Sequence, residues 1–186
     1  MTEVSSLTGR LLVATPALAD PNFDRAVVLL LDHDEEGSLG VVLNRPTPVD
    51  VGDILEGWGE LAGEPGVVFQ GGPVSLDSAL GVAVIPGEDG PLGWRRVHGA
   101  IGLVDLEAPP ELLAAALGSL RIFAGYSGWG PGQLENELTE GAWYVVESEP
   151  GDVSATRPEG LWRAVLRRQR SELAMVATYP DDPSLN

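Results

Sequence analysis

The chain has 186 residues, of which 44% are hydrophobic and 21% are charged, so it is long and apolar enough for one domain with a sizeable core. Its formal net charge of −17 argues against nucleic acid as the main partner, because affinity for a phosphate backbone comes chiefly from Lys and Arg. It contains no cysteine and no lysine, which excludes disulfides, thiol catalysis, Schiff-base chemistry and the phosphate-binding lysine of a P-loop.

The N-terminal segment does not resemble a signal peptide, because it lacks a basic start and Pro16 interrupts its apolar run. No window approaches the roughly 18 apolar residues that a membrane-spanning helix needs. We therefore expect a cytoplasmic protein that makes no use of a membrane. The sequence carries no signal for an oligomeric state.

Apolar runs in the first third of the chain predict strands at Arg10–Ala14, Ala26–Asp32 and Leu39–Leu43. The second and third of these are expected to form an antiparallel hairpin. Its loop would be the acidic connector His33–Ser38, which is about six residues long. A short helix is predicted over Asp50–Trp58, with the aspartate as its N-cap.

The middle and the end of the chain alternate short strands with helices. Strands are predicted at Val67–Gln70, Ala79–Ile85, Trp94–His98, Ile101–Leu106, Arg121–Tyr126 and Ala142–Glu147. The second and third of these are expected to pair with each other around an exposed turn. Helices are predicted at Pro109–Leu120, Pro131–Glu140 and Pro158–Arg170. Because there is no internal repeat, linker or break in composition, we expect a single α+β domain over residues 1–186.

A glycine-rich stretch between a predicted strand and a predicted helix, Tyr126–Gly132, is the first candidate for a binding site. Such a turn leaves the first backbone N–H groups of the helix free, and these favour an anion. Gln133 would add a side-chain donor, while Tyr126 or Trp129 would cover an apolar part of a ligand. The alternative is that glycines such as Gly130 only permit a tight corner and that the aromatic side chains belong to the core.

The same stretch begins a nucleophile-elbow pattern at Ser127, which would make that serine the nucleophile of a hydrolase. The pattern fails two residues later, where Trp129 stands in place of the second glycine. His33 and His98 both precede the serine, whereas an α/β-hydrolase places its histidine after it. The sequence therefore argues against serine hydrolysis.

His33 lies in an acidic run with Asp32, Asp34, Glu35 and Glu36, which has the side chains of a metal site in one place. A metal site needs further ligands from elsewhere in the chain. The alternative is a solvated acidic hairpin tip that blunts aggregation, and we prefer it because charged loop runs are usually exposed.

Two other groups of charged side chains have structural interpretations. Glu135 and Glu137 flank the Leu134/Leu138 stripe of a predicted helix, and we expect one of them to form an ion pair with Arg45 or Arg121. An arginine stripe on the last predicted helix is the only concentrated basic patch; it consists of Arg163, Arg167, Arg168 and Arg170. It complements the negative end of its own helix, which we prefer to contact with nucleic acid.

Several long motifs together resemble the YqgE/AlgH family of bacterial proteins. In chain order they are GRLLVATPAL, DPNFDRAVVLLLDHDEEGSLGVVLNRP, FQGGPV and GYSGWGPGQLENEL, and the similarity runs from Leu7 to the C-terminal DPSLN. The resemblance implies an α+β fold with a mixed, branched and partly barrel-like sheet surrounded by several short helices. It also implies a cytosolic protein without a settled activity, one member being named for a role in regulating alginate synthesis.

We therefore expect a non-catalytic regulatory or binding protein without catalytic residues, cofactor or metal. Its functional surface would include the turns at Gly71-Gly72-Pro73 and Tyr126–Gly132, with a small anionic ligand or a protein as its partner. If it regulates transcription, it would act through a protein partner, because direct binding to nucleic acid conflicts with its charge.

The competing hypothesis is an enzyme that acts on a small anionic substrate, assisted by a metal at His33. A deep pocket lined by His33, Asn44, Ser127 and Glu135 would favour the enzyme. Hydrogen bonds among those same groups would favour the binding protein.

Overall fold

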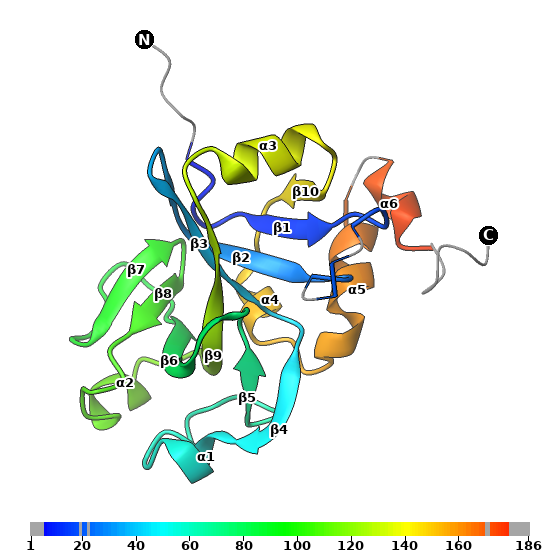
Figure 1. Ribbon diagram of the computed structural model, residues 1–186. Helices are drawn as coiled ribbons and strands as arrows, with labels where there is room; N and C mark the ends of the chain where they lie inside the picture. The colour runs from blue at the N-terminus through cyan, green and yellow to red at the C-terminus, as the bar shows by residue number, and fades with distance from the viewer. Residues whose placement is uncertain (1–5, 19, 22, 170–171, 179–186) are drawn as a thin grey trace.

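The computed structural model describes residues 6–18, 20–21, 23–169 and 172–178. Within these ranges one ten-stranded sheet dominates the molecule (Figure 1). Its strands are β1 (Leu11–Ala14), β2 (Val27–Asp34), β3 (Gly37–Val42), β4 (Pro46–Asp50), β5 (Val67–Gln70), β6 (Val74–Val84), β7 (Trp94–His98), β8 (Ile101–Val104), β9 (Ser119–Trp129) and β10 (Trp143–Val146).

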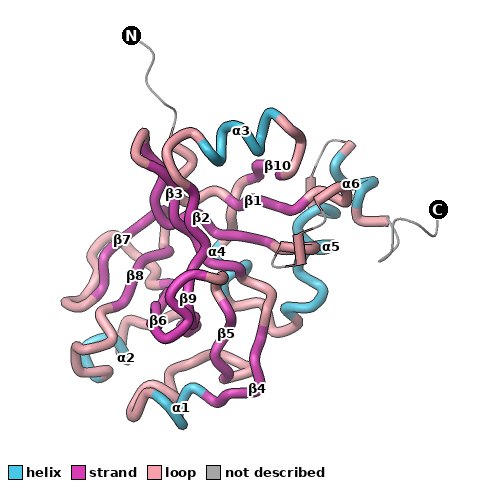
Figure 2. The backbone as a smooth tube through the Cα atoms, viewed as in Figure 1, coloured by secondary structure: helices cyan, strands magenta, loops and turns pink. Residues whose placement is uncertain are grey.

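The helices are short and lie around the sheet (Figure 2). They are α1 (Val51–Ile54), α2 (Glu111–Ala114), α3 (Gln133–Thr139), α4 (Pro150–Val153), α5 (Leu161–Arg167) and α6 (Leu173–Val176), with a 3-10 turn, η1 (Pro158–Gly160). None of the helices in the described part of the chain is long and apolar enough to cross a membrane.

The sheet branches at β9. The strand order is β10-β1-β2-β3-β9-β6-β8-β7, and β5 also pairs with β9 while β4 pairs with β5. Strand β6 pairs along one edge of β9. Two strands share the other edge: β5 pairs in parallel at Phe123, and β3 pairs antiparallel from Ser127 to Trp129. The predicted α+β class and the mixed, branched, partly barrel-like sheet are therefore confirmed.

Alternation along the strands sends side chains into different cores on the two faces of the sheet. Leu11 and Val27 belong to the core that the sheet encloses, which also receives α5. Their neighbours Leu12 and Val28 belong to a second core, which Leu134 of α3 covers. Burying each such side chain stabilises the fold by about 1.5–3 kcal/mol, so both apolar faces of these strands need a cover, which α3 supplies on one and α5 on the other.

A third core holds α1 and α2 against the other half of the sheet. Val51 of α1, Trp58 and Leu113 of α2 pack with Ile122 of β9 and Ile85. The three cores together cover both faces of β9, which explains why this strand is buried over most of its length.

The predicted loop His33–Ser38 is wrong, because β2 and β3 extend into it and only Glu35 and Glu36 form the turn. The pairing of β6 with β7 is also wrong. Gly99 and Ala100 form the turn that joins β7 to β8, so β8 lies between the two strands that were expected to pair.

Two further elements of the structure differ from what the sequence predicted. The helix predicted over Pro109–Leu120 is limited to α2, because Gly118 N–H donates to Val84 O and the residues after it enter β9. Strand β4 was not predicted, since its two prolines are unusual in a strand.

The glycine-rich turn predicted over Tyr126–Gly132 is wrong for its first half, because Tyr126 to Trp129 are part of β9. Gly125 explains the difference: its φ of +71° is a left-handed conformation that glycine adopts without strain. The pairing with β6 shifts at this point, as in a β-bulge. After the bulge Tyr126 packs against the enclosed core while Trp129 joins the core under α3.

Candidate functional site

The curled sheet leaves a seam where its edge strand β7 approaches the N-terminal segment. A Cβ atom on Gly9 would lie 2.3 Å from Cβ of His98, so the backbone of Gly9 packs directly against the end of β7. Gly9 N–H donates to Leu30 O of β2 at 2.8 Å. The contact at Gly9 therefore brings β7 and β2 to opposite sides of one gap in the sheet (Figure 1).

This gap forms a cleft of about 460 Å³, which we call the seam cleft. Its volume lies within the range of roughly 300–1,000 Å³ that is usual for small-molecule sites. Six buried or half-buried apolar residues form its walls: Leu31, Leu39, Leu80, Val97, Leu103 and Tyr126. Polar side chains complete the lining: Thr8, Asp32, Arg95 and Arg96.

The two arginines of the seam cleft differ in what they bind. Arg96 donates to the backbone oxygens of Gly87, Glu88 and Gly99, and its guanidinium lies 5.0 Å from the centre of the Trp94 ring. The side chain of Arg95 is exposed and makes no hydrogen bond or ion pair with any residue that the structure describes. Its guanidinium is therefore the cation of the cleft that has donors available for a ligand.

The candidate residues of the glycine-rich stretch separate in the structure. Tyr126 lines the seam cleft, whereas Ser127 is fully buried and donates its Oγ hydrogen to Gly71 O at 3.1 Å. A Cβ atom on Gly72 would lie 2.2 Å from the carbonyl of Tyr126. The two glycine-rich segments thus lie side by side, as a close approach of two backbones at the branch of the sheet.

Two of the backbone amides expected to hold an anion, those of Gly130 and Gln133, are engaged within the protein. Gly130 N–H donates to Gln133 Oε1 at 3.0 Å, and Gln133 N–H donates to Gly130 O at 3.1 Å. The amide group of Gln133 donates in turn to Glu137 Oε2 at 3.1 Å. The polar groups of Gly130 and Gln133 that were expected to meet a ligand therefore bind each other and α3.

His33 joins the β2–β3 hairpin to α3. Its Nδ1 lies 2.6 Å from Ser38 Oγ and its Nε2 lies 3.8 Å from Glu135 Oε2. The imidazole is 1% exposed and the carboxylate 43% exposed, so the pair is half screened by water. The expected ion pair of Glu135 or Glu137 with Arg45 or Arg121 is wrong, because both arginines donate to backbone carbonyls instead.

Asn44 has a structural role beside the start of β2. Its Oδ1 accepts from Val27 N–H at 3.0 Å, and its Nδ2 donates to Arg25 O at 2.9 Å. Asn44 and Ser127 make their hydrogen bonds to the backbone, and His33 and Glu135 face each other elsewhere. These four candidates therefore line no common pocket among the described residues.

The acidic hairpin tip borders a shallow depression of about 240 Å³. Three carboxylates line it, those of Asp32, Asp34 and Glu36, together with Ser38 and Trp129. Among the residues that the structure describes, no group of three or more His, Asp and Glu side chains is arranged to hold a metal ion.

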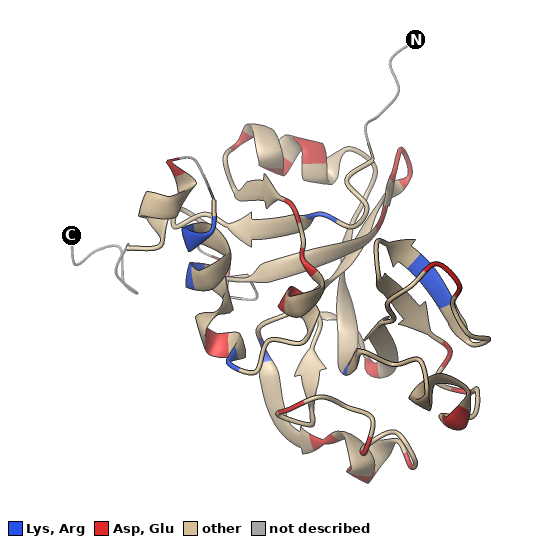
Figure 3. Ribbon diagram, turned by 180° about the vertical axis from the view of Figure 1, so that it is seen from behind, with Lys and Arg blue, Asp and Glu red and all other residues tan. Residues whose placement is uncertain are grey.

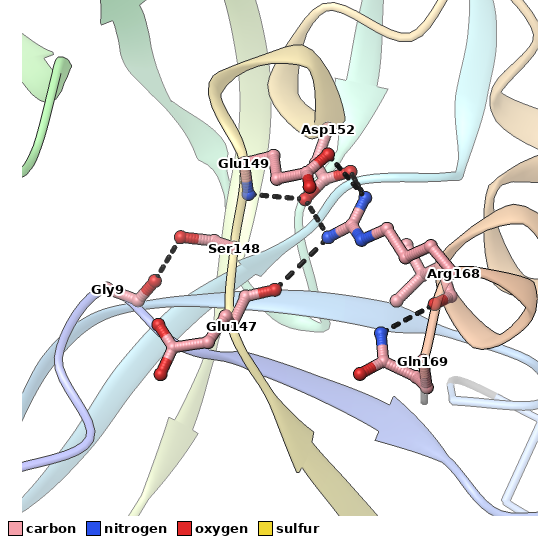
Figure 4. Close-up of polar contacts among 8 residues, drawn as sticks. Gly9, Glu147, Ser148, Glu149, Asp152, Arg168 and Gln169 are labelled. Carbon is pink, nitrogen blue, oxygen red and sulfur yellow. Dashed lines mark hydrogen bonds and ion pairs between the residues drawn. The ribbon is translucent and has the colours of Figure 1, made fainter. Parts of the chain in front are cut away.

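Two arginines of the predicted stripe at α5 are engaged within the protein. Arg168 binds both oxygens of Asp152, at 2.6 and 2.7 Å, and lies 3.3 Å from Glu149 (Figure 4). The hydrogen bonds to Asp152, whose effect outweighs that of burial, raise the pKa of the Arg168 guanidinium. Arg163 donates to Ala177 O, while Arg167 is exposed and Arg170 lies outside the described residues.

Sequence reasoning found Tyr126 as a binding candidate and named Asp32 only within the acidic run, and it missed the other residues of the seam cleft. They come from separate strands that only the sheet order brings together. A signal was present at Arg95 and Arg96, two adjacent cations in a strand of a strongly acidic chain. Because adjacent side chains of a strand point to opposite faces of the sheet, such a pair places one cation on each face.

Solved structures show the class to which this fold belongs. The crystal structure of DIP2367 from Corynebacterium diphtheriae matches with a TM-score of 0.89 and 31% identity, covering 96% of this chain and 95% of that one. The solution structure of AlgH from Pseudomonas aeruginosa matches with a TM-score of 0.69 and 27% identity, covering 97% of both chains. The molecule is thus an α+β protein with a curled, half-barrel sheet.

Sequence comparisons agree with the structures. The family model described as AlgH-like, DUF179, matches residues 11–174. A UPF0301 protein of Streptomyces avermitilis is 90% identical over 190 residues, covering 100% of this chain and 98% of that protein. One from Mycobacterium tuberculosis is 45% identical over 181 residues, covering 96% and 90%. The chain therefore belongs to the AlgH-like (UPF0301) family, as its motifs predicted.

Proposed function

We propose that this protein is a non-catalytic binding protein and that the seam cleft holds its ligand. One observation carries the proposal: apolar walls of ligand size stand beside a guanidinium, that of Arg95, with no partner among the described residues. Apolar walls with a few polar groups are typical of sites that bind small molecules. The ligand is accordingly small and has an apolar body.

A regulatory role of the protein would pass through a protein partner. The acidic side chains are spread over many elements, while the arginines are few and several of them are grouped at α5 and on β7 (Figure 3). Arg168 already binds carboxylates of its own chain. With a net charge of −17, the surface would repel a nucleic-acid backbone. Gel shifts at physiological salt should therefore show no tight, sequence-specific binding, and such binding would contradict this part of the proposal.

The experiment for the cleft uses N-phenylnaphthylamine, a neutral apolar dye whose fluorescence rises when it leaves water. Leu80 is half-buried in the wall of the cleft, and Leu92 is 80% exposed on a turn outside it. We expect Leu80→Gln to weaken dye binding several-fold and Leu92→Gln, the matched control, to leave it unchanged. Equal binding by both folded variants would contradict the cleft as the ligand site.

The competing proposal is that the protein is an enzyme. It is supported by the arrangement of Ser38, His33 and Glu135, in which the imidazole lies between a hydroxyl and a carboxylate. Two features weigh against it. Ser38 is only 9% exposed, and the depression beside it is lined by carboxylates that would repel an anionic substrate. A fluorophosphonate probe that labelled Ser38 in the parent protein, but not after His33→Asn, would support the enzyme instead.

A further inference from the structure

We propose that the ligand of the seam cleft is a linear aliphatic monocarboxylate, a fatty-acid-like molecule whose carboxylate binds Arg95. This inference rests on the proposed function, because it names the chemistry of the ligand for the same cleft. Its support comes from the charges at the rim of the cleft and from the apolar walls.

The rim offers an anionic head group one guanidinium whose side chain has no partner among the described residues. Arg96, by contrast, is held in place by three hydrogen bonds to backbone carbonyls of neighbouring turns. Arg95 lies on the same strand with its donors available and with its partner residue across the ladder, Leu103, in the wall of the cleft. A guanidinium presents two parallel N–H groups, which match the two oxygens of a carboxylate.

Asp32 limits the charge of that head group. It is exposed on the β2 side of the cleft and forms no ion pair with Arg95, although both line the cleft. The rim thus carries the charges of Arg95, Arg96 and Asp32, whose sum is a single positive charge. One negative charge on the ligand balances that sum with Arg95 as its hydrogen-bond partner, whereas a second would be unbalanced and repelled by Asp32. A carboxylate fits this arrangement better than a dianionic phosphate monoester.

The walls suit an unbranched apolar chain. Leu80, Leu103 and Tyr126 are half-buried and come from three adjacent strands, β6, β8 and β9. They pack against the enclosed core, so their positions are fixed before a ligand arrives. An aliphatic chain that covers them leaves water, and the side chains of Leu80 and Leu103 offer it no polar group.

The test displaces the neutral dye with three ligands of the same chain length, namely decanoate, decanol and decyl phosphate. For the parent we expect decanoate to bind more tightly than decyl phosphate. Arg95→Gln should weaken decanoate about tenfold, as expected for loss of a charge-assisted pair, and leave decanol unchanged. Arg167→Gln, on α5 outside the cleft, is the matched control and should change neither. Asp32→Asn should improve the affinity for decyl phosphate.

The outcomes separate this inference from the proposed function. If the dye and all three ligands fail to bind, both are contradicted. If decanol and decanoate bind equally and Arg95→Gln affects neither, the cleft binds apolar molecules but the carboxylate is wrong. If Arg95→Gln weakens decanol as much as decanoate, the arginine supports the shape of the cleft instead of the head group, which also overturns the inference.

Discussion

The indole nitrogens of Trp129 and Trp143 donate to the same carboxylate oxygen, Oε1 of Glu137, at 3.1 and 2.9 Å. The two rings meet edge to face at 6.1 Å, and Phe23 packs on both. Trp129 ends β9 and Trp143 begins β10, so one glutamate of α3 ties together two strands that are distant in the sheet. Helix α3 is therefore held by polar contacts as well as by its buried Leu134.

Two glutamates of α3 give a matched test of that attachment. Glu137→Ala leaves two largely buried indole donors without their acceptor, and we expect it to lower the free energy of unfolding by about 2–3 kcal/mol. Glu135→Ala removes a half-exposed partner 3.8 Å from His33, and we expect a change within about 0.5 kcal/mol. Urea denaturation measures both values. Equal losses would show that the indole contacts do not hold the helix.

Alanine substitutions at Gly125 and Gly66 distinguish the energetic cost of a left-handed backbone conformation from the additional cost of a steric clash. Their φ angles are +71° and +69°, but a Cβ on Gly125 would lie 2.7 Å from Gly72 O, whereas one on Gly66 meets nothing within 4 Å. We expect Gly66→Ala to cost about 1–2 kcal/mol, the usual penalty for this conformation. Gly125→Ala should cost at least about 3 kcal/mol, because it also disturbs the bulge. Thermal unfolding that ranks the two variants equally would contradict the role given to Gly125.

Arg121 gives the fold a dependence on alkaline pH. It is 2% exposed, and burial lowers the pKa of its guanidinium to about 10. Its donors reach Glu64 O at 2.8 Å and Ala155 O at 2.9 Å, while its guanidinium lies 4.2 Å from the centre of the Phe69 ring. Above this pKa the folded protein loses a proton that the unfolded chain still holds, so stability rises with pH there.

The comparison with Arg121→Met isolates this effect, because other groups that titrate are common to both proteins. Between about pH 8 and pH 10.5, the free energy of unfolding of the parent should rise by roughly 0.8 kcal/mol relative to the variant. Urea denaturation at the two pH values measures the difference. A difference that stays constant, or one that moves in favour of the variant, would show that burial does not lower this pKa.

Ser127→Ala should affect stability slightly and ligand binding not at all. The substitution removes the hydrogen bond to Gly71 O, but that oxygen keeps the N–H of Val42 at 2.9 Å. We expect a loss of about 0.5–1.5 kcal/mol and unchanged binding of N-phenylnaphthylamine, since Ser127 does not line the seam cleft. A large loss of dye binding by the folded variant would contradict the seam cleft as the ligand site and would indicate a site at the branch of the sheet.

The sequence predicted elements whose signal is local. The apolar run predicted as a strand at Ala26–Asp32 contains the continuous buried part of β2, from Val27 to Leu31, because a strand covered on both faces needs apolar residues at every position. The glycine-rich composition misled the prediction of a turn at Tyr126–Gly132. At the branch of the sheet, Gly71, Gly72 and Gly125 allow two backbones to approach closely, and a turn has the same composition.

The candidate site was less predictable, because its residues meet only through the order of the strands. Leu80, Arg95 and Leu103 lie on three strands that were expected to pair differently, and Thr8 and Asp32 close the gap from the other end of the sheet. Only Tyr126 was singled out beforehand as a ligand-binding candidate, and it reaches the cleft because the bulge at Gly125 turns it toward the enclosed core.

The most direct test of the ligand site is a two-dimensional NMR titration of nitrogen-15-labelled protein with decanoate. We predict that the backbone amide signals of Leu80, Arg95, Leu103 and Tyr126 shift together and saturate, because these residues line the seam cleft. The signals of Gly71, Gly72, Gly130 and Gln133 should stay in place. Shifts that cluster on those four residues and spare the cleft would contradict the proposal that ligands bind at the seam of the sheet.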